Sequence, residues 1–161
     1  MEPGICREHL TTLLREESAL LAELEELLQR ESGILESSDV QALEATTRAR
    51  QERVGALARI EEQRRSLCAV HGFSADRAGL EKLIAWCDSR GTLLPRLREC
   101  AERAVRCRDL NDRNGIVVGA RLKRVGSMLD ALTGRPSRSD TYGPRGYNNP
   151  NTRPGRVLGA A

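Results

Sequence analysis

The stretch LNDRNGIVVGARL, residues 110–122, lies in the middle of the longest helical pattern in this sequence. It contains two asparagines, Asn111 and Asn114, and two glycines, Gly115 and Gly119. Glycine in a helix interior costs roughly 1 kcal/mol relative to alanine, and asparagine is a weak helix former. A helix that keeps such residues at its centre needs a reason for them, and the surrounding pattern supplies two candidates.

The helical pattern around this stretch extends from about Thr92 to Thr133, roughly 60 Å at 1.5 Å per residue. Pro95 is tolerated in the first turn, where its missing N–H has no helical partner. Seam residues recur at 3–4 spacing over five heptads, which is typical of a coiled coil. In this interpretation Asn114 flanks a seam of Leu94, Leu97, Ala101, Ala104, Arg108, Asn111, Gly115, Val118, Leu122, Val125, Leu129 and Leu132.

Three earlier helices are predicted, and each is followed by a glycine, the usual residue just past a helix end. Their ranges are Pro3–Ser32, about residues 40–71, and Asp76–Ser89, followed by Gly33, Gly72 and Gly91. Ser38 is the expected cap of the second helix, with Gln41 three residues later. The predicted inward residues are Leu10, Leu14, Leu21, Leu24 and Leu28, then Val40, Leu43, Val54, Leu57, Ile60 and Leu67, then Leu80, Leu83, Ile84 and Cys87.

Composition agrees with an all-α protein of long helices. The 161 residues are 30% charged and only 2% aromatic, so the core must come from aliphatic side chains. The expected fold is a coiled-coil-like bundle of long antiparallel helices with one short extra helix, over residues 1–133. Residues 134–161 hold four of the six prolines and five of the fourteen glycines, which predicts a flexible tail.

Charge is distributed unevenly along the helices. Residues 1–31 hold eight acidic residues and three Arg, a net charge of −5. Residues 90–132 hold ten basic and five acidic residues, a net charge of +5. The first and last helices are therefore expected to be neighbours, although exposed ion pairs are individually weak.

Catalytic, metal and cofactor chemistry finds no support in the sequence. His9 and His71 lie in no known motif, no Gly-rich phosphate loop occurs, and Cys100 and Cys107 are too far apart along a helix to share a zinc ion. Five irregularly spaced cysteines favour free thiols and a cytoplasmic protein. No apolar run approaches 18 residues and the N-terminus has no secretory pattern, so no membrane insertion is expected.

Nucleic-acid binding is not expected either. Arg accounts for 24 of the 26 basic residues, but these are interleaved with acids and form no clean basic face.

Protein binding remains as the function. The Asn111, Asn114 and Gly115 patch either fixes helix register, as a buried Asn can, or recognises a partner helix. After it comes an apolar stripe that a partner helix can occupy if the helix extends beyond its own bundle. The stripe includes Val118, Leu122, Val125, Met128, Leu129 and Leu132.

The segment LNDRNGIVV, Leu110 to Val118, resembles the Asn-x-x-Asn-Gly signature in the last long helix of FlgN-type flagellar export chaperones. The order of helices is similar over about residues 5–132, and TYGPRG, Thr141 to Gly146, is similar to a Tyr-Gly-Pro-x-Gly element that often follows that helix. The sequence departs from the family in one respect. Ile116-Val117-Val118 stands where members usually have Leu-Ile soon after the Asn-Gly.

The resemblance implies a cytoplasmic type III export chaperone with no reaction and no cofactor. Its implied partners are the hook–filament junction (hook-associated) proteins and a component of the flagellar export gate. The hypothesis for client binding is docking along Val118, Leu122, Val125 and Leu129, with Asn111, Asn114 and Gly115 beside them. Tyr142 and Tyr147 in the tail are further candidates. A non-catalytic coiled-coil scaffold or adaptor is the alternative.

Overall fold

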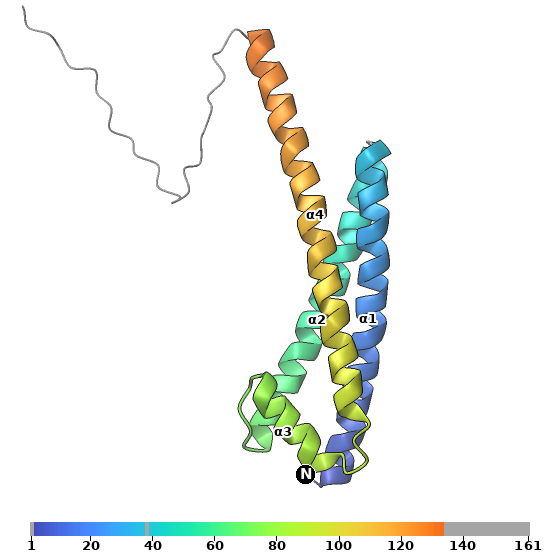
Figure 1. Cartoon of the computed structure of the whole chain (residues 1–161), viewed down its shortest axis with the longest axis vertical. Coiled ribbons are helices and arrows are strands. Elements are labelled where there is room, and N and C mark those ends of the chain that lie inside the picture. Colours follow the sequence, from blue (N-terminus) through green and yellow to red (C-terminus); the bar gives the residue numbers. More distant parts are fainter. Residues whose placement is uncertain (1, 38, 134–161) are drawn as a thin grey trace, which may run out of the picture. The chain divides into compact units, whose positions relative to one another are not determined.

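The computed structural model describes residues 2–37 and 39–133, which form four α-helices (Figure 1). The helices are α1 (Pro3–Ser37), α2 (Val40–Val70), α3 (Arg77–Cys87) and α4 (Leu93–Thr133). The chain divides into two units, Met1–Leu122 and Lys123–Ala161. Of the second unit, only the last residues of α4 are described. The predicted all-α class is confirmed, whereas the tail predicted for residues 134–161 lies outside the described residues.

The first unit is a bundle of long helices closed at one end by the short helix α3. Helix α2 runs antiparallel to α1 and to the adjoining part of α4, so α1 and α4 run parallel to each other (Figure 1). This is the predicted arrangement of long antiparallel helices.

Two clusters of buried side chains form the core of this unit. One joins all four helices near α3 and contains Cys6, Leu10, Leu14, Leu67, Cys68, Leu80, Leu83, Ile84, Cys87, Leu93 and Leu97. The other lies further along α1 and α4 and contains Leu21, Leu24, Leu28, Cys100 and Cys107. The residues predicted to face inward are confirmed on α3 and for the five leucines of α1. On α2 the prediction is wrong for Val40 and Val54, which are more than half exposed.

Aspartates cap the starts of α2 and α3. Asp39 accepts a hydrogen bond from the Ala42 N–H at 3.0 Å, so the expectation that Ser38 caps α2 is wrong. Asp76 accepts from the Gly79 N–H at 2.7 Å and from the Ser74 hydroxyl at 2.7 Å. A Cβ on Gly79 would lie 1.9 Å from the Ser74 carbonyl oxygen, so this turn requires glycine.

A third aspartate links α1 to the start of α4. The Asp88 carboxylate accepts hydrogen bonds from the Leu93 N–H at 2.7 Å and from Arg7 Nε at 3.0 Å, and the Thr92 hydroxyl lies 3.3 Å away. Its side chain is fully buried. Burial acts to raise the pKa of Asp88, but these hydrogen bonds outweigh burial and lower the pKa.

The predicted helix ends are confirmed except for the end of the first helix. Gly72 (φ 74°) follows α2 in the left-handed region that favours glycine, as expected. Gly33, however, lies inside α1, which continues to Ser37. Leu35, two residues later, is 3% exposed, so packing of this last segment outweighs the weak helix propensity of one glycine.

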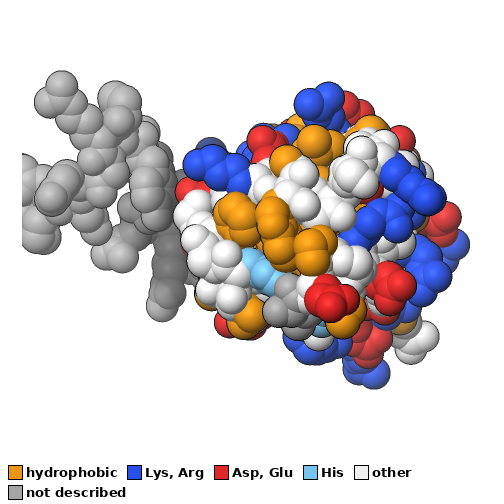
Figure 2. All heavy atoms as spheres, turned by 90° about the horizontal axis from the view of Figure 1, so that it is seen from below, with side chains coloured by type: hydrophobic (Ala, Val, Ile, Leu, Met, Phe, Trp, Pro, Cys, Tyr) orange, Lys and Arg blue, Asp and Glu red, His pale blue; other side chains and the backbone are white. Residues whose placement is uncertain are grey.

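The end of the molecule at which α3 lies also carries hydrophobic side chains on its surface. Figure 2 views this end and shows such side chains gathered next to a histidine, with charged residues around them. The Trp86 ring lies with its centroid 5.0 Å from that of His71 and 6.5 Å from that of Phe73, and Trp86 is 45% exposed. The described aromatic side chains therefore form a partly exposed cluster at this end.

Candidate protein-binding surface

Asn114 lies at the centre of a buried polar contact between α1 and α4. Its side-chain Nδ2 donates to the Leu28 carbonyl oxygen at 2.9 Å and to Glu31 Oε2 at 2.9 Å. Asn114 and Glu31 are each 4% exposed. Because an unpaired carboxylate in such a position is costly, the hydrogen bond from Asn114 offsets part of the cost of burying Glu31.

Helix α2 completes the same contact through Arg50. Arg50 Nη2 lies 3.6 Å from Glu31 Oε1, and its Nη1 donates to Asn111 Oδ1 at 2.8 Å. Glu31, Arg50, Asn111 and Asn114, here called the polar layer, thus connect all three long helices. Both asparagines of the opening stretch contact the protein's own helices, which supports the fold-defining interpretation for them.

The register of α4 on α1 repeats every seven residues. Cys100 Sγ lies 3.7 Å from the Leu14 carbonyl oxygen, Cys107 Sγ lies 3.6 Å from that of Leu21, and Asn114 contacts that of Leu28. The sequence separation is 86 residues in all three pairs. A constant separation means that the helices are parallel and in heptad register, and thiols and an amide are short enough to sit against the α1 backbone.

The sequence-based seam of α4 is therefore wrong in detail. The buried residues of α4 are Leu93, Leu97, Cys100, Cys107 and Asn114. Asn111 and Gly115, which the sequence pattern predicts in the seam, are exposed, whereas Asn114, which it predicts on the flank, is buried. Cysteine and asparagine fill core positions that an apolar pattern leaves out.

Burial along α4 stops at Asn114, although the apolar pattern continues. None of residues 115–133, all of which the structure describes, is buried. Val118 is 39% exposed and Leu122 is 68% exposed. In the second unit, Val125, Met128, Leu129 and Leu132 are each more than half exposed. Val118 and Val125 come three and four heptads after the buried Leu97, but the intervening residues at this heptad position, Ala104 and Asn111, are already exposed.

The glycines beside these residues have open space above them. A Cβ at Gly115 or Gly119 would meet no atom within 4 Å. Neither glycine is therefore required by packing inside the described chain, although each weakens the helix. We call Val118, Leu122, Val125 and Leu129 the apolar stripe.

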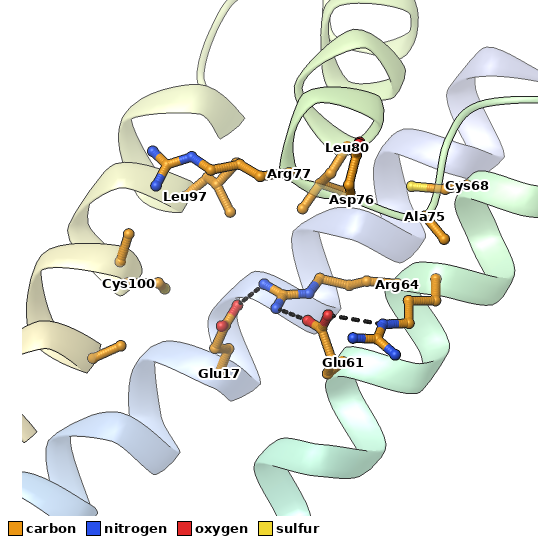
Figure 3. Close-up of a pocket in the computed structure, with 13 residues that line it drawn as sticks. Glu17, Glu61, Arg64, Cys68, Ala75, Asp76, Arg77, Leu80, Leu97 and Cys100 are labelled. Carbon is orange, nitrogen blue, oxygen red and sulfur yellow. Dashed lines mark hydrogen bonds and ion pairs between the residues drawn. The ribbon is translucent and has the colours of Figure 1, made fainter. Parts of the chain in front are cut away.

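A separate cavity of about 250 Å³ lies among the four helices, and its polar side is an ion-pair cluster (Figure 3). Arg64 donates to Glu17 Oε2 at 2.6 Å and also contacts Glu61, which accepts from Arg65 Nε at 3.0 Å. Burial raises the pKa of Glu17 despite the adjacent guanidinium. Burial acts to raise the pKa of Glu61 as well, but hydrogen bonds from Arg64 and Arg65 lower it. These contacts join α1 to α2.

Metal binding finds no assembled site in the described part of the chain. Within residues 2–37 and 39–133, no group of three or more His, Cys, Asp or Glu side chains could hold a metal ion. All five cysteines are free, as predicted, and all five are buried.

The structure brings together some of the predicted site residues and leaves others apart. Asn111 and Asn114 belong to the polar layer, Gly115 follows it directly, and the apolar stripe residues are exposed on the same helix. Tyr142 and Tyr147 lie outside the described residues.

Sequence reasoning missed Glu31 and Arg50. Glu31 stands at 3–4 spacing with Leu24, Leu28 and Leu35, so the sequence spacing indicates its place on the inner face of α1.

The fold and this surface define a helical protein-binding module, in which a polar layer ends the packed seam and an exposed apolar helix follows. The family model described as FlgN protein matches residues 1–150, and the chain belongs to the FlgN family. It is a flagellar export chaperone for hook-associated proteins, of a family that is non-catalytic. No curated protein and no solved structure matches the chain.

Proposed function

We propose that hook-associated proteins bind to the apolar stripe of α4 as an amphipathic helix. The observation that carries this proposal is that burial ends at Asn114, while α4 continues with large apolar side chains that are exposed. Burying a Val or Leu side chain contributes about 1.5–3 kcal/mol, so a few such contacts hold a client helix. Covering a client's assembly segment in this way prevents it from polymerising before export.

The open glycines support the same site. A client helix can approach α4 closely at Gly115 and Gly119, where no described atom lies above the backbone. Their retention in a helix that they destabilise is accounted for if a partner's side chains occupy that space.

The test replaces two residues of the apolar stripe with negatively charged glutamate. Val118→Glu with Leu122→Glu is expected to abolish capture of purified hook-associated proteins, while the helical circular dichroism signal is retained because both residues are exposed. The matched control is Val54→Glu with Val105→Glu, two exposed valines outside the stripe, which should leave capture unchanged. Intact binding by the folded stripe variant would place the client elsewhere.

The proposal extends to the rest of the export pathway. We place the protein in the cytoplasm, and we expect it to deliver its client to the export gate, with Tyr142 and Tyr147 contacting the client or the gate. A chain truncated after Gly134 should then lose affinity for at least one of these two partners. Unchanged affinity for both, measured by isothermal titration calorimetry, would remove the tail from the proposal.

No helix within the described ranges has the length and apolarity needed to cross a bilayer.

A further inference from the structure

We infer that the client helix bound by the apolar stripe carries acidic residues along one edge, in a pattern that copies α1. This inference rests on the proposed function, because it names the chemistry of the partner at the same site. It follows from how α4 already binds a helix within the bundle.

The contact between α1 and α4 pairs an apolar seam with a line of cations beside it. Glu25 of α1 lies 2.8 Å from Arg106 Nε and 3.5 Å from Arg103 Nε. This pair of arginines flanks Cys107, the seam residue that contacts the Leu21 carbonyl. This edge of α4 thus pairs with an acidic residue that follows a seam leucine of the partner helix by four positions.

The same cationic edge continues at the polar layer and beyond it without a counterpart. Arg113 comes one heptad after Arg106, and Arg124 comes three heptads after Arg103. Neither forms a hydrogen bond or an ion pair with another described residue, and both are exposed. On α1, the residue one heptad after Glu25 is Ser32, which carries no charge. The acid that would match the continued edge is therefore missing from the bundle itself.

Charge argues against other occupants of the stripe. Residues 134–161 of this chain hold five Arg and one Asp, so they bring the same sign of charge as Arg113 and Arg124. The α4 helix of a second copy would do the same. An anionic lipid surface also attracts a cationic amphipathic helix. The heptad match to the Glu25 contact favours a helix, and lipid binding is an outcome that the experiment separates.

The experiment measures binding of a client peptide to the full chain. The probe is a synthetic peptide of the segment through which a hook-associated protein assembles, in its natural form and with every Asp and Glu replaced by Asn and Gln. Arg113→Glu with Arg124→Glu is expected to weaken binding of the natural peptide about 10-fold at low salt, and the effect should shrink at high salt because exposed charges are screened. The neutralised peptide should bind the unaltered chain with a similar loss.

A matched control variant makes the same change in net charge at two positions outside the stripe. Arg90→Glu with Arg98→Glu alters two exposed arginines and should change the affinity less than 2-fold. Equal affinities of both double variants, or equal affinities of the two peptides, would overturn the inference while leaving docking on the stripe intact. If the natural peptide binds with unchanged affinity to the folded Val118→Glu and Leu122→Glu variant, the proposed site itself fails. A different outcome would assign the edge to lipid: the chain binds anionic vesicles but not the peptide, and Arg113→Glu with Arg124→Glu abolishes the vesicle binding.

Discussion

Asn114 and Asn111 are separated by one helical turn, yet their environments differ. Asn114 is buried and donates two hydrogen bonds to α1, whereas Asn111 is exposed and accepts one from Arg50 of α2. When a buried donor is lost, its hydrogen bonds cannot be replaced by water. When an exposed acceptor is lost, its donor can hydrogen-bond to water instead. The two asparagines should therefore contribute unequally to stability.

Asn114→Ala is expected to lower the free energy of unfolding by about 1–3 kcal/mol, since the Glu31 carboxylate and the Leu28 carbonyl lose their donor. Asn111→Ala should change it by no more than about 0.5 kcal/mol. Urea denaturation followed by circular dichroism measures both. In the double variant Asn114→Leu with Glu31→Leu, part of the lost stability should return, because the buried Glu31 carboxylate that lost its donor is removed as well. Equal values for the two alanine variants would contradict the assignment.

The polar layer could be predicted only in part from the sequence. The pattern placed Asn111 and Asn114 near a helix seam, because they interrupt an apolar repeat. It could not show which of the two asparagines is buried. Two seam assignments, shifted by one residue, fit the same segment when cysteine, alanine and asparagine occupy core positions. Nor could it supply Arg50, which comes from a helix 61 residues away and meets Asn111 only after the chain has folded.

Asp88 makes stability depend on pH. Its pKa in the folded chain is below the ordinary value near 3.9, so the native state favours the charged carboxylate. The stabilisation is therefore complete above about pH 4 and is lost as pH falls through the lowered folded pKa. Asp88→Asn should be less stable than the natural chain at pH 7, and the difference should shrink as the pH is lowered toward 2. A difference that stays constant over this range in chemical denaturation would show that charge on Asp88 does not matter.

At the scale of the helix, the type of each element was predictable and one boundary was not. Gly72 and Gly33 look alike as stop signals in the sequence, but only Gly72 has the positive φ of a helix end. Whether a helix stops at a glycine depends on how the next residues pack. Leu35 is buried after Gly33, and this tertiary contact is not visible in local sequence.

Gly33→Ala should therefore stabilise the protein by about 0.5–1 kcal/mol, because alanine is the better helix residue and no atom lies within 4 Å of its Cβ position. Gly72→Ala is the opposite case and should destabilise it by about 1–2 kcal/mol, since an L-residue is strained at φ 74°. Thermal unfolding compares the two variants. A loss of stability in Gly33→Ala would mean that α1 ends at that glycine in solution.

At the scale of the whole molecule, charge predicted which distant helices meet. The acidic first helix and the basic last helix are neighbours, as the contacts of Glu25 with Arg103 and Arg106 confirm. The heptad register was not predictable, because it depends on thiol and amide contacts to the α1 backbone rather than on apolar side chains alone. For the proposed client surface, the sequence predicted a stripe, and the structure shows that its residues are exposed.

A chaperone of this design should be stabilised by its client. The client peptide should raise the midpoint of thermal unfolding, since a ligand at 100 times its dissociation constant adds about 2.7 kcal/mol. Light scattering coupled to size exclusion should show a complex of defined stoichiometry with the intact hook-associated protein. The variant Val118→Glu with Leu122→Glu should show neither effect. A large symmetric oligomer that excludes the client would instead indicate a scaffold whose seams are already filled.

The buried thiols can report local opening of the bundle, because each thiol becomes reactive only when it is exposed to solvent. Burial raises the pKa of Cys6 to about 12 and that of Cys100 to about 11, so neither reacts readily with alkylating reagents while the chain is folded. Cys100 and Cys107 contact α1 along the seam with α4, whereas Cys6, Cys68 and Cys87 lie in the cluster with α3. Alkylation over time, resolved by mass spectrometry for each cysteine, would therefore measure separately how often α4 parts from α1 and how often the end closed by α3 unfolds.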